Sequence, residues 1–187
     1  MKKALVLMAQ GFEEIELTTV VDLLRRAEIE VTLASIDKHE FVRGAHEMSI
    51  KADKILSECD TNRYDALVLP GGWPGALNLF ESAEVQNIIS QFAQENKLVA
   101  AICAAPYILG KMGLLNGKKA TCYPGFEGDL KGATLRNCPS VTDGKFITGK
   151  GPGYAAQFAM AIVEELVGNE KVAELEKSTF FLSYKTK

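Results

Sequence analysis

The sequence predicts an α/β fold of the doubly wound type, in which a mostly parallel sheet is covered by helices on both faces. Apolar runs typical of buried strands alternate with amphipathic runs typical of helices, and this alternation is typical of parallel sheets. The 187 residues are enough for one domain with a substantial core. No repeat, linker or low-complexity segment interrupts the alternation, so we expect a single domain.

The strand-like runs are short, apolar and rich in Val, Ile and Leu. They cover residues 3–8, 30–36, 65–69, 98–102, 119–123 and 146–148. Asp143-Gly144 precedes the last of them and predicts a hairpin turn.

The predicted helices lie between these strands or after them, at residues 14–27, 104–112, 154–167 and 170–181. One more begins near Ser82, which is a favourable N-cap residue. Its apolar face has the i, i+3, i+4, i+7 spacing of an amphipathic helix and consists of Val85, Ile88, Ile89 and Phe92.

Composition argues against several classes of protein. The net charge of −3 gives no reason to expect nucleic acid or an anionic membrane as a partner. No apolar run approaches the roughly 20 residues that span a bilayer. The apolar part after Met1-Lys2-Lys3 is too short for a signal peptide and acidic residues follow it, so we expect a cytoplasmic protein. Lys185 and Lys187 are expected to form a solvated tail.

The four cysteines lie far apart and form no CxxC pair. Without a secretion signal, a disulfide framework is not expected. Neither His39 nor His46 has a metal-ligand spacing to a cysteine. We therefore expect no metal site and no cofactor.

Cys103 is the strongest candidate for chemistry, because it follows a buried strand and precedes a helix. Ala101 and Ala105 are the small residues that a tight nucleophile elbow requires on either side. A helix N-terminus favours thiolate over thiol, which predicts a lowered pKa for this cysteine alone among the four. A buried structural cysteine is the alternative interpretation, and this stretch does not separate the two.

Ligands of doubly wound sheets bind beyond the carboxyl ends of the strands, where three loops of this chain should converge. One loop begins at Gly11, and another begins with Cys103. The third contains Gly71 and Gly72, whose N–H groups could point at an oxyanion, with the N–H of Ala104 as a second donor. On its own, the glycine pair favours a simple turn, and its place next to the elbow cysteine gives weight to the oxyanion hole.

Glu16 is expected on the apolar face of the first helix, in line with Val20, Leu23 and Ala27. A carboxyl group there is desolvated, so its pKa should rise and it could donate a hydrogen bond to a thiolate. Removing this donor would then raise the pKa of the thiol. Glu13 shares the angular sector, but we favour a simple pairing with the helix N-terminus for it.

Together these stretches resemble the ThiJ/PfpI superfamily, and within it the YajL-like branch that includes the parkinsonism-associated deglycase. The matching residues run in family order to about residue 168: Lys3-Ala4-Leu5-Val6-Leu7, Gly11-Phe12-Glu13-Glu14-Ile15-Glu16, Val68-Leu69-Pro70-Gly71-Gly72, Ala100-Ala101-Ile102-Cys103-Ala104-Ala105-Pro106, Gly151-Pro152-Gly153 and Phe158-Ala159-Met160-Ala161-Ile162-Val163-Glu164.

The resemblance implies one ThiJ/PfpI-type domain over residues 1–187, similar to class I glutamine amidotransferases, with a flavodoxin-like sandwich fold. It implies a homodimer and makes Cys103 the reactive, oxidation-sensitive cysteine with Glu16 as its protonated partner. Gly71, Gly72 and Ala104 match the backbone positions around that cysteine.

This chain departs from the family pattern around the cysteine. Protease-like members carry His directly after it, where this chain has Ala104, and this argues against a peptidase. Deglycase-like members often carry His where this chain has Tyr123, and relatives carry Arg near the position of His46. Tyr123 and His46, with Gly151 and Pro152 of the helix-entry loop, are the candidate pocket residues, although that loop is equally consistent with a simple turn.

The leading functional hypothesis is an enzyme that converts a reactive dicarbonyl such as methylglyoxal, free or added to protein side chains, into lactate. The alternative is a redox-sensing, chaperone-like dimer, and an intracellular cysteine peptidase ranks third. For the dimer we expect an interface over surplus apolar surface, provided by Leu17, Val20, Val21, Met48 and Ile50.

Overall fold

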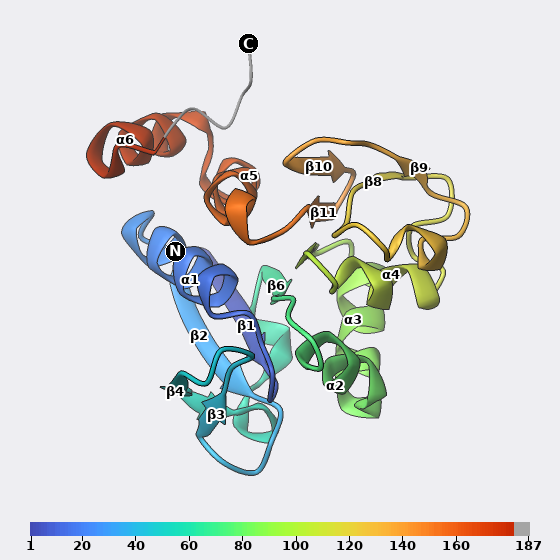
Figure 1. The fold of residues 1–187 in the computed structure, drawn as a ribbon. Coiled ribbons are helices and arrows are strands. Elements are labelled where there is room, and N and C mark those ends of the chain that lie inside the picture. The colour runs from blue at the N-terminus through green and yellow to red at the C-terminus, as the bar shows by residue number, and fades with distance from the viewer. Residues whose placement is uncertain (182–187) are drawn as a thin grey trace.

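The computed structural model describes residues 1–181, so Lys185 and Lys187 lie outside the described residues. It has the predicted α/β architecture, built on a seven-stranded sheet (Figure 1). The strand order is β10-β11-β7-β6-β1-β2-β5, and only β10 runs antiparallel to its neighbour. The strands are β1 Lys3–Met8, β2 Glu30–Ser35, β5 Lys54–Ile55, β6 Ala66–Leu69, β7 Leu98–Ile102, β10 Ser140–Asp143 and β11 Phe146–Gly149.

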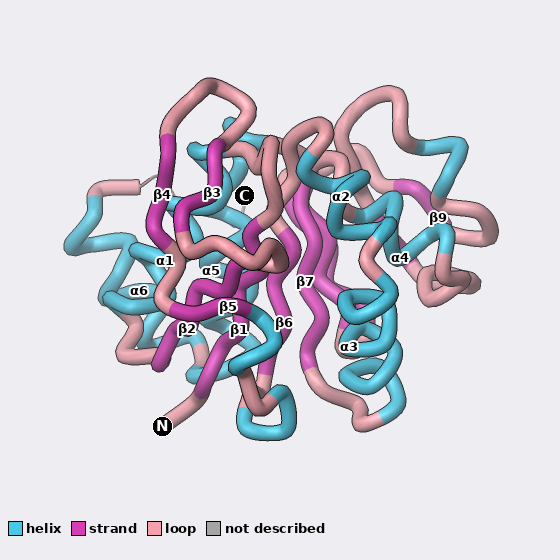
Figure 2. Tube along the Cα trace, turned by 90° about the horizontal axis from the view of Figure 1, so that it is seen from below, coloured by secondary structure: helices cyan, strands magenta, loops and turns pink. Residues whose placement is uncertain are grey.

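Helices cover both faces of the sheet, as Figure 2 shows. One face carries α1 Glu14–Arg26 and α5 Ala155–Val167, with α6 Asn169–Thr179 packed on α5. The other face carries α2 Gly75–Glu81, α3 Ala83–Gln94 and α4 Pro106–Lys111. Ser82 caps α3 as predicted, because its side chain accepts a hydrogen bond from the N–H of Val85 at 3.3 Å.

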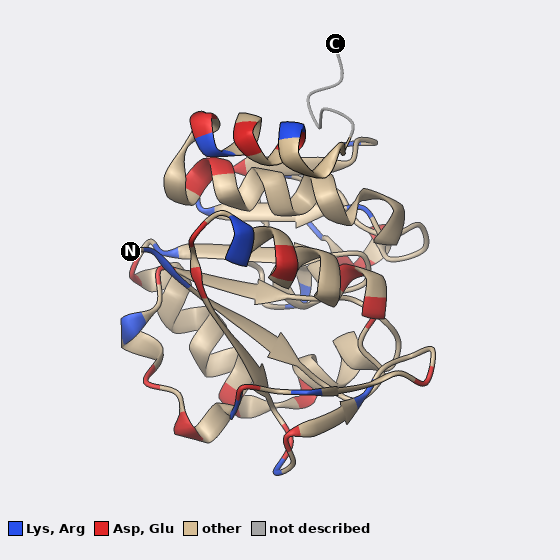
Figure 3. Ribbon diagram, turned by 90° about the vertical axis from the view of Figure 1, so that its left-hand side faces the viewer, with Lys and Arg blue, Asp and Glu red and all other residues tan. Residues whose placement is uncertain are grey.

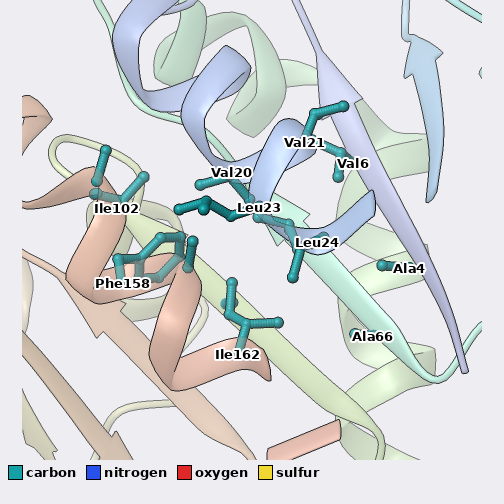
Figure 4. Close-up of a cluster of buried hydrophobic side chains, with 14 of the residues drawn as sticks. Ala4, Val6, Val20, Val21, Leu23, Leu24, Ala66, Ile102, Phe158 and Ile162 are labelled. Atoms are coloured by element: carbon teal, nitrogen blue, oxygen red, sulfur yellow. The ribbon is translucent and has the colours of Figure 1, made fainter. Parts of the chain in front are cut away.

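The core has two apolar layers because successive side chains of a strand point to opposite faces. Ala4, Val6 and Met8 of β1 belong to the layer under α1 and α5, whereas Leu5 and Leu7 belong to the layer under α2, α3 and α4. Figure 4 shows part of the first layer; its labelled helical residues are Val20, Val21, Leu23 and Leu24 of α1 and Phe158 and Ile162 of α5.

This packing corrects part of the expected dimer surface. Leu17 and Val20 are 1% exposed and Val21 is 8% exposed, so these residues of α1 belong to the core. These residues were expected to exceed what one inward face of α1 buries, but α1 packs on both the sheet and α5 and so buries a wider stripe. Met48 is 57% exposed and remains available, while Ile50 is partly buried against the core.

Several segments differ from the predicted elements. The strand expected at 119–123 ends early: β8 Lys119–Ala120 pairs with β9 Thr134–Leu135, outside the main sheet. The next residue, Thr121, donates its N–H to Oγ1 of Thr148 at 3.0 Å, so the backbone leaves the ladder there. The hairpin of β3 Phe41–Arg43 and β4 Ser49–Lys51 was not predicted, and neither was α2.

Charged residues of both signs are interspersed over the helices and loops, while the central strands are almost free of them (Figure 3). Within residues 1–181, no helix has the length and apolar character needed to cross a membrane.

Candidate active site

The three predicted loops do converge, because β1, β6 and β7 are neighbouring parallel strands whose carboxyl ends lie at one edge. They bring together Cys103 after β7, Gly71 and Gly72 after β6, and Glu16 in the first turn of α1. Glu13 is tied to this group, since its N–H donates to the carbonyl oxygen of Gly71 at 3.0 Å.

Cys103 occupies a strained corner, with φ of 65°. A left-handed conformation in a non-glycine residue costs on the order of 1–3 kcal/mol and persists only where neighbouring contacts impose it. Here the N–H of Cys103 donates to the carbonyl of Gly149 at 2.9 Å, and its carbonyl accepts from the N–H of Tyr123 at 2.8 Å. The corner therefore has the geometry predicted for a nucleophile elbow.

Gly71 is the residue that lets Cys103 and Glu16 approach each other. A Cβ atom at this position would lie 2.6 Å from Cβ of Cys103 and 2.7 Å from Oε2 of Glu16. The N–H of Gly71 donates to the same Oε2 at 2.8 Å. This N–H is therefore already occupied by Glu16, and Gly71 positions the acid instead of serving as the expected oxyanion donor.

Replacing Gly71 by alanine is expected to destabilise the fold by about 1–3 kcal/mol, because the added methyl group overpacks a closed site. Chemical denaturation measures this change. Gly128→Ala is the matched control, since a Cβ there would meet no atom within 4 Å. Equal stability of the two variants would contradict the tight packing around Gly71.

The Glu16 carboxyl group is fully buried. Burial raises its pKa to about 7, and the charge of Glu13 adds to this, while hydrogen bonding to Cys103 and to the N–H of Gly71 opposes it. Its second oxygen, Oε1, is buried and makes no hydrogen bond of ordinary geometry in the described part of the chain. The predicted rise in pKa is confirmed.

The pKa of Cys103 is raised, and the predicted lowering is wrong. Burial is the main cause and the negative charge of Glu16 the second, while hydrogen bonds from the N–H groups of Gly72 and Ala104 act in the opposite direction. The helix α4 begins only at Pro106 and is short, so its N-terminal field does not outweigh these effects. Burial also raises the pKa values of the other three cysteines, Cys59, Cys122 and Cys138.

Cys103 and Glu16 therefore titrate as a pair. Because each negative charge disfavours the other, the pair carries one negative charge over a wide pH range above 7. That charge can reside on the carboxylate or, after transfer of the thiol proton to Glu16, on the sulfur. A carboxyl group with a pKa near neutrality is suited to such a transfer.

A pocket of about 430 Å³ opens above Cys103. Six of the predicted site residues line it: Cys103, Gly72, Ala104, Tyr123, His46 and Pro152. Glu16 and Gly71 are not among the lining residues. Gly151 is not either; a Cβ there would lie 3.2 Å from the Tyr123 ring, so this glycine leaves room for the ring.

Four further lining residues were missed as pocket residues by the sequence analysis: Glu13, Ile15, Trp73 and Phe126. Trp73 is the only tryptophan of the chain and directly follows Gly72, which was a usable signal. No signal in the sequence placed Phe126 in the pocket, because it lies in a loop whose course depends on tertiary contacts.

His46 forms a polar cluster with two buried acids at the edge of the pocket. Its Nδ1 lies 3.0 Å from Oε2 of Glu14 and 3.4 Å from Oε2 of Glu13. Glu14 raises the pKa of His46. Although burial acts to raise the pKa of Glu14, hydrogen bonds from His46 and from the backbone of Met48 hold it below its ordinary value.

This cluster also places three metal-ligating groups within 4.8 Å of one another. This cluster was not predicted, because the sequence argument considered only spacings between cysteine and histidine. Glu13 occupies the N-cap position of α1, the helix N-terminus we expected it to pair with, but its side chain makes no capping hydrogen bond and lies beside His46. The ion pairs and hydrogen bonds within the cluster account for its geometry.

Comparison with known proteins identifies the family of this chain. Residues 2–165 match the model of the DJ-1/PfpI family. Protein dj-1beta of Drosophila melanogaster is 40% identical over 178 residues, covering 94% of this chain and 95% of that protein. The Parkinson disease protein 7 homolog of Danio rerio is 37% identical over 179 residues, covering 94% and 95%.

Among solved structures, oxidized Toxoplasma gondii DJ-1 superposes with a TM-score of 0.94 at 34% sequence identity, covering 98% of this chain and all of that one. Drosophila melanogaster DJ-1beta superposes with a TM-score of 0.92 at 38% identity, covering 97% of this chain and 99% of that one. The flavodoxin-like fold is thereby confirmed, whereas the YajL-like branch stays a prediction. The family match and the shared fold both lead to the conclusion that this chain belongs to the DJ-1/PfpI family.

Proposed function

We propose that this protein is a cysteine-dependent enzyme that converts reactive dicarbonyls into hydroxy acids. The observation that carries the proposal is the pairing of Cys103, accessible from a pocket, with the buried Glu16, whose pKa of about 7 suits proton transfer. The substrate is a free dicarbonyl such as methylglyoxal or its adduct with a protein side chain. The chemistry needs no metal or cofactor.

In the first step, Glu16 takes the proton of the Cys103 thiol and the sulfur attacks the aldehyde carbon. The carbonyl double bond opens and its oxygen becomes an alkoxide. The N–H groups of Gly72 and Ala104, which lie beside the sulfur, stabilise that charge. Glu16 then gives its proton to this alkoxide, and the product of the step is a neutral hemithioacetal bound to Cys103.

The second step is an internal oxidation and reduction. The hydrogen on the former aldehyde carbon moves with its electron pair, as a net hydride, to the neighbouring ketone carbon, so the first carbon is oxidised by two electrons and the second is reduced by two. The hydroxyl proton of the hemithioacetal moves to the new alkoxide oxygen. Water then cleaves the resulting thioester, which releases lactate and returns the thiol. One water is consumed and no external oxidant is required.

A second candidate is a redox-sensing, chaperone-like dimer in a stress response. Two equivalents of peroxide would oxidise the Cys103 thiol to a sulfinate and release two waters. The same N–H groups of Gly72 and Ala104 would bind the sulfinate oxygens, and the similar Toxoplasma gondii structure is described as oxidized. Peptidase activity ranks third, because Ala104 leaves no imidazole next to the nucleophile.

The deciding experiment measures lactate formation from methylglyoxal by the purified wild-type protein, without added glutathione and with trace glyoxalase excluded. Sustained turnover supports the enzyme. Absence of turnover combined with stoichiometric conversion of Cys103 to sulfinate by peroxide would overturn it in favour of the redox sensor. We further propose a cytoplasmic location, because a reducing compartment keeps cysteines free, as all four are here.

We also propose that the protein is a homodimer. Ile15 and Met48 are 55% and 57% exposed. Ile15 lines the pocket together with His46, and Met48 lies two residues beyond His46 in the chain. An isologous contact would cover them. Light scattering should give about twice the chain mass of 20.4 kDa.

Met48→Asp should shift the equilibrium toward the monomer, because a charge would then lie in the apolar contact. Leu135→Asp is the control, since that side chain is 45% exposed on β9 and does not line the Cys103 pocket. A wild-type monomer would contradict this assembly.

A further inference from the structure

Aromatic rings form one wall of the Cys103 pocket. The Trp73 ring lies 5.5 Å from the Phe126 ring and 6.1 Å from the Tyr107 ring, measured between centroids. Tyr107 and Phe126 are 6.2 Å apart and meet edge to face. The three rings therefore support one another, which fixes Trp73 in place although it is 51% exposed.

The pocket is much larger than a small dicarbonyl requires. Methylglyoxal has about five heavy atoms, which need at most ~150 Å³ if each takes the space of a water molecule. The pocket measures about 430 Å³. When the aldehyde carbon meets the sulfur of Cys103, a substituent has room to reach the other lining residues, which include Trp73 and Phe126.

The charges on the lining exclude one class of substituent. Within residues 1–181, no lysine or arginine lines the pocket, and its ionisable side chains besides Cys103 and Tyr123 are Glu13 and His46. His46 is already paired with Glu14 and Glu13. A carboxylate or phosphate on the substrate would therefore find no free cation among these lining residues and would face the buried Glu13.

We propose that this site selects uncharged α-oxoaldehydes that carry an apolar, ring-sized substituent, which packs against Trp73 and Phe126. The inference rests on the proposed function and specifies its substrate class. Atoms and electrons balance as they do for methylglyoxal, since an aryl-substituted oxoaldehyde plus one water gives the corresponding aryl hydroxy acid.

The kinetic test compares kcat/KM for phenylglyoxal, methylglyoxal and 4-carboxyphenylglyoxal, which are all α-oxoaldehydes and can all undergo the same reaction. In the wild type, phenylglyoxal should exceed methylglyoxal by about tenfold or more, because one added methylene group in an apolar pocket is already worth about tenfold. The carboxylate of 4-carboxyphenylglyoxal should make it a poorer substrate than phenylglyoxal. Trp73→Ala should abolish most of the preference and Trp73→Phe should restore part of it.

The ratio of kcat/KM for phenylglyoxal to kcat/KM for methylglyoxal is compared between variants, because the difference in intrinsic reactivity of the two aldehydes is the same in each and cancels. Phe41→Ala is the control, because this exposed aromatic residue lies on β3 and does not line the pocket. A ratio that Trp73→Ala leaves unchanged would overturn the inference, and so would a preference for 4-carboxyphenylglyoxal over phenylglyoxal.

A binding experiment separates failure of this inference from failure of the proposed function. The Cys103→Ser variant is titrated by calorimetry with 1-phenyl-1,2-propanedione and with 2,3-butanedione, which differ by a phenyl in place of a methyl group. Tighter binding of the phenyl compound, lost in Cys103→Ser/Trp73→Ala, supports the aromatic wall even if the wild type turns over no dicarbonyl. Equal binding of both compounds contradicts it even if turnover is observed.

Discussion

Replacing Cys103 by alanine is expected to reduce kcat/KM for methylglyoxal by at least ~1,000-fold, because no other group can form the covalent intermediate. The remaining lining residues bind and orient the substrate but include no second thiol. Lactate production per enzyme, measured with freshly purified variant, checks this. The expected residual rate is that of the solution reaction.

Cys122→Ala is the matched control for this variant. Cys122 is a second buried cysteine, 5% exposed, and lies one residue from Tyr123, yet it does not line the Cys103 pocket. Its replacement should leave turnover within about twofold of wild type, as substitutions outside an active site usually do. Lactate formation that survives in Cys103→Ala would refute covalent catalysis by this residue.

The same pair of variants tests the redox alternative. If Cys103 is a sensor, peroxide should add about 32 Da to the wild type and to Cys122→Ala but not to Cys103→Ala, since a sulfinate carries two added oxygens. That result without any turnover by the wild type would favour the sensor over the enzyme.

The regular part of the fold could be predicted because its signals are local. The strands at 3–8 and 98–102 were predicted with the observed bounds, since each is a continuous apolar run buried on both faces. The hairpin of β3 and β4 is short and largely polar, so it has no such run. Its position depends on tertiary contacts, including the hydrogen bonds that Glu14 accepts from His46 and Met48.

Most residues of the candidate site could be predicted from the sequence, but the electrostatic effects on their pKa values could be predicted only in part. The positions of Cys103 and Glu16 follow from sheet topology and helical periodicity, which sequence patterns contain. The direction of the shift in the Cys103 pKa depends on burial and on the charge of the nearby Glu16. Sequence patterns contain neither. Phe126 was missed for the same reason, since only the folded loop brings its ring to Trp73.

Replacing Glu16 by glutamine is expected to change the pH dependence of stability. The pKa of Glu16 rises from 4.5 to about 7 on folding, so the folded state binds the proton more tightly than the unfolded state. The stabilising contribution is complete below pH 4.5 and is lost as the pH rises through 7. Keeping this buried carboxyl ionised then costs the folded state ~3 kcal/mol.

Glutamine keeps the shape and an oxygen that can accept from Gly71, but it does not titrate. Relative to the wild type, the variant should therefore gain ~3 kcal/mol of unfolding free energy between about pH 4.5 and pH 8.5. Urea denaturation at both pH values measures the gain. An equal difference between the two proteins at both pH values would mean that Glu16 does not have a raised pKa.

The thiol should respond in the direction opposite to the one the sequence predicts. Because the negative charge of Glu16 raises the pKa of Cys103, removing it in Glu16→Gln or Glu16→Ala should lower that pKa. Glutamine should lower it further, since its amide can donate to a thiolate. The rate of Cys103 alkylation as a function of pH, followed by peptide mass spectrometry, gives the values.

Turnover should nevertheless fall by ~100-fold or more in both Glu16 variants, because neither side chain can accept the thiol proton and return it during the reaction. A more ionised but less productive cysteine would identify Glu16 as the proton carrier and not merely as a stabiliser of the thiolate. If activity instead follows the fraction of thiolate and increases in Glu16→Gln, proton transfer by Glu16 is not required, and the role proposed for this pair is wrong.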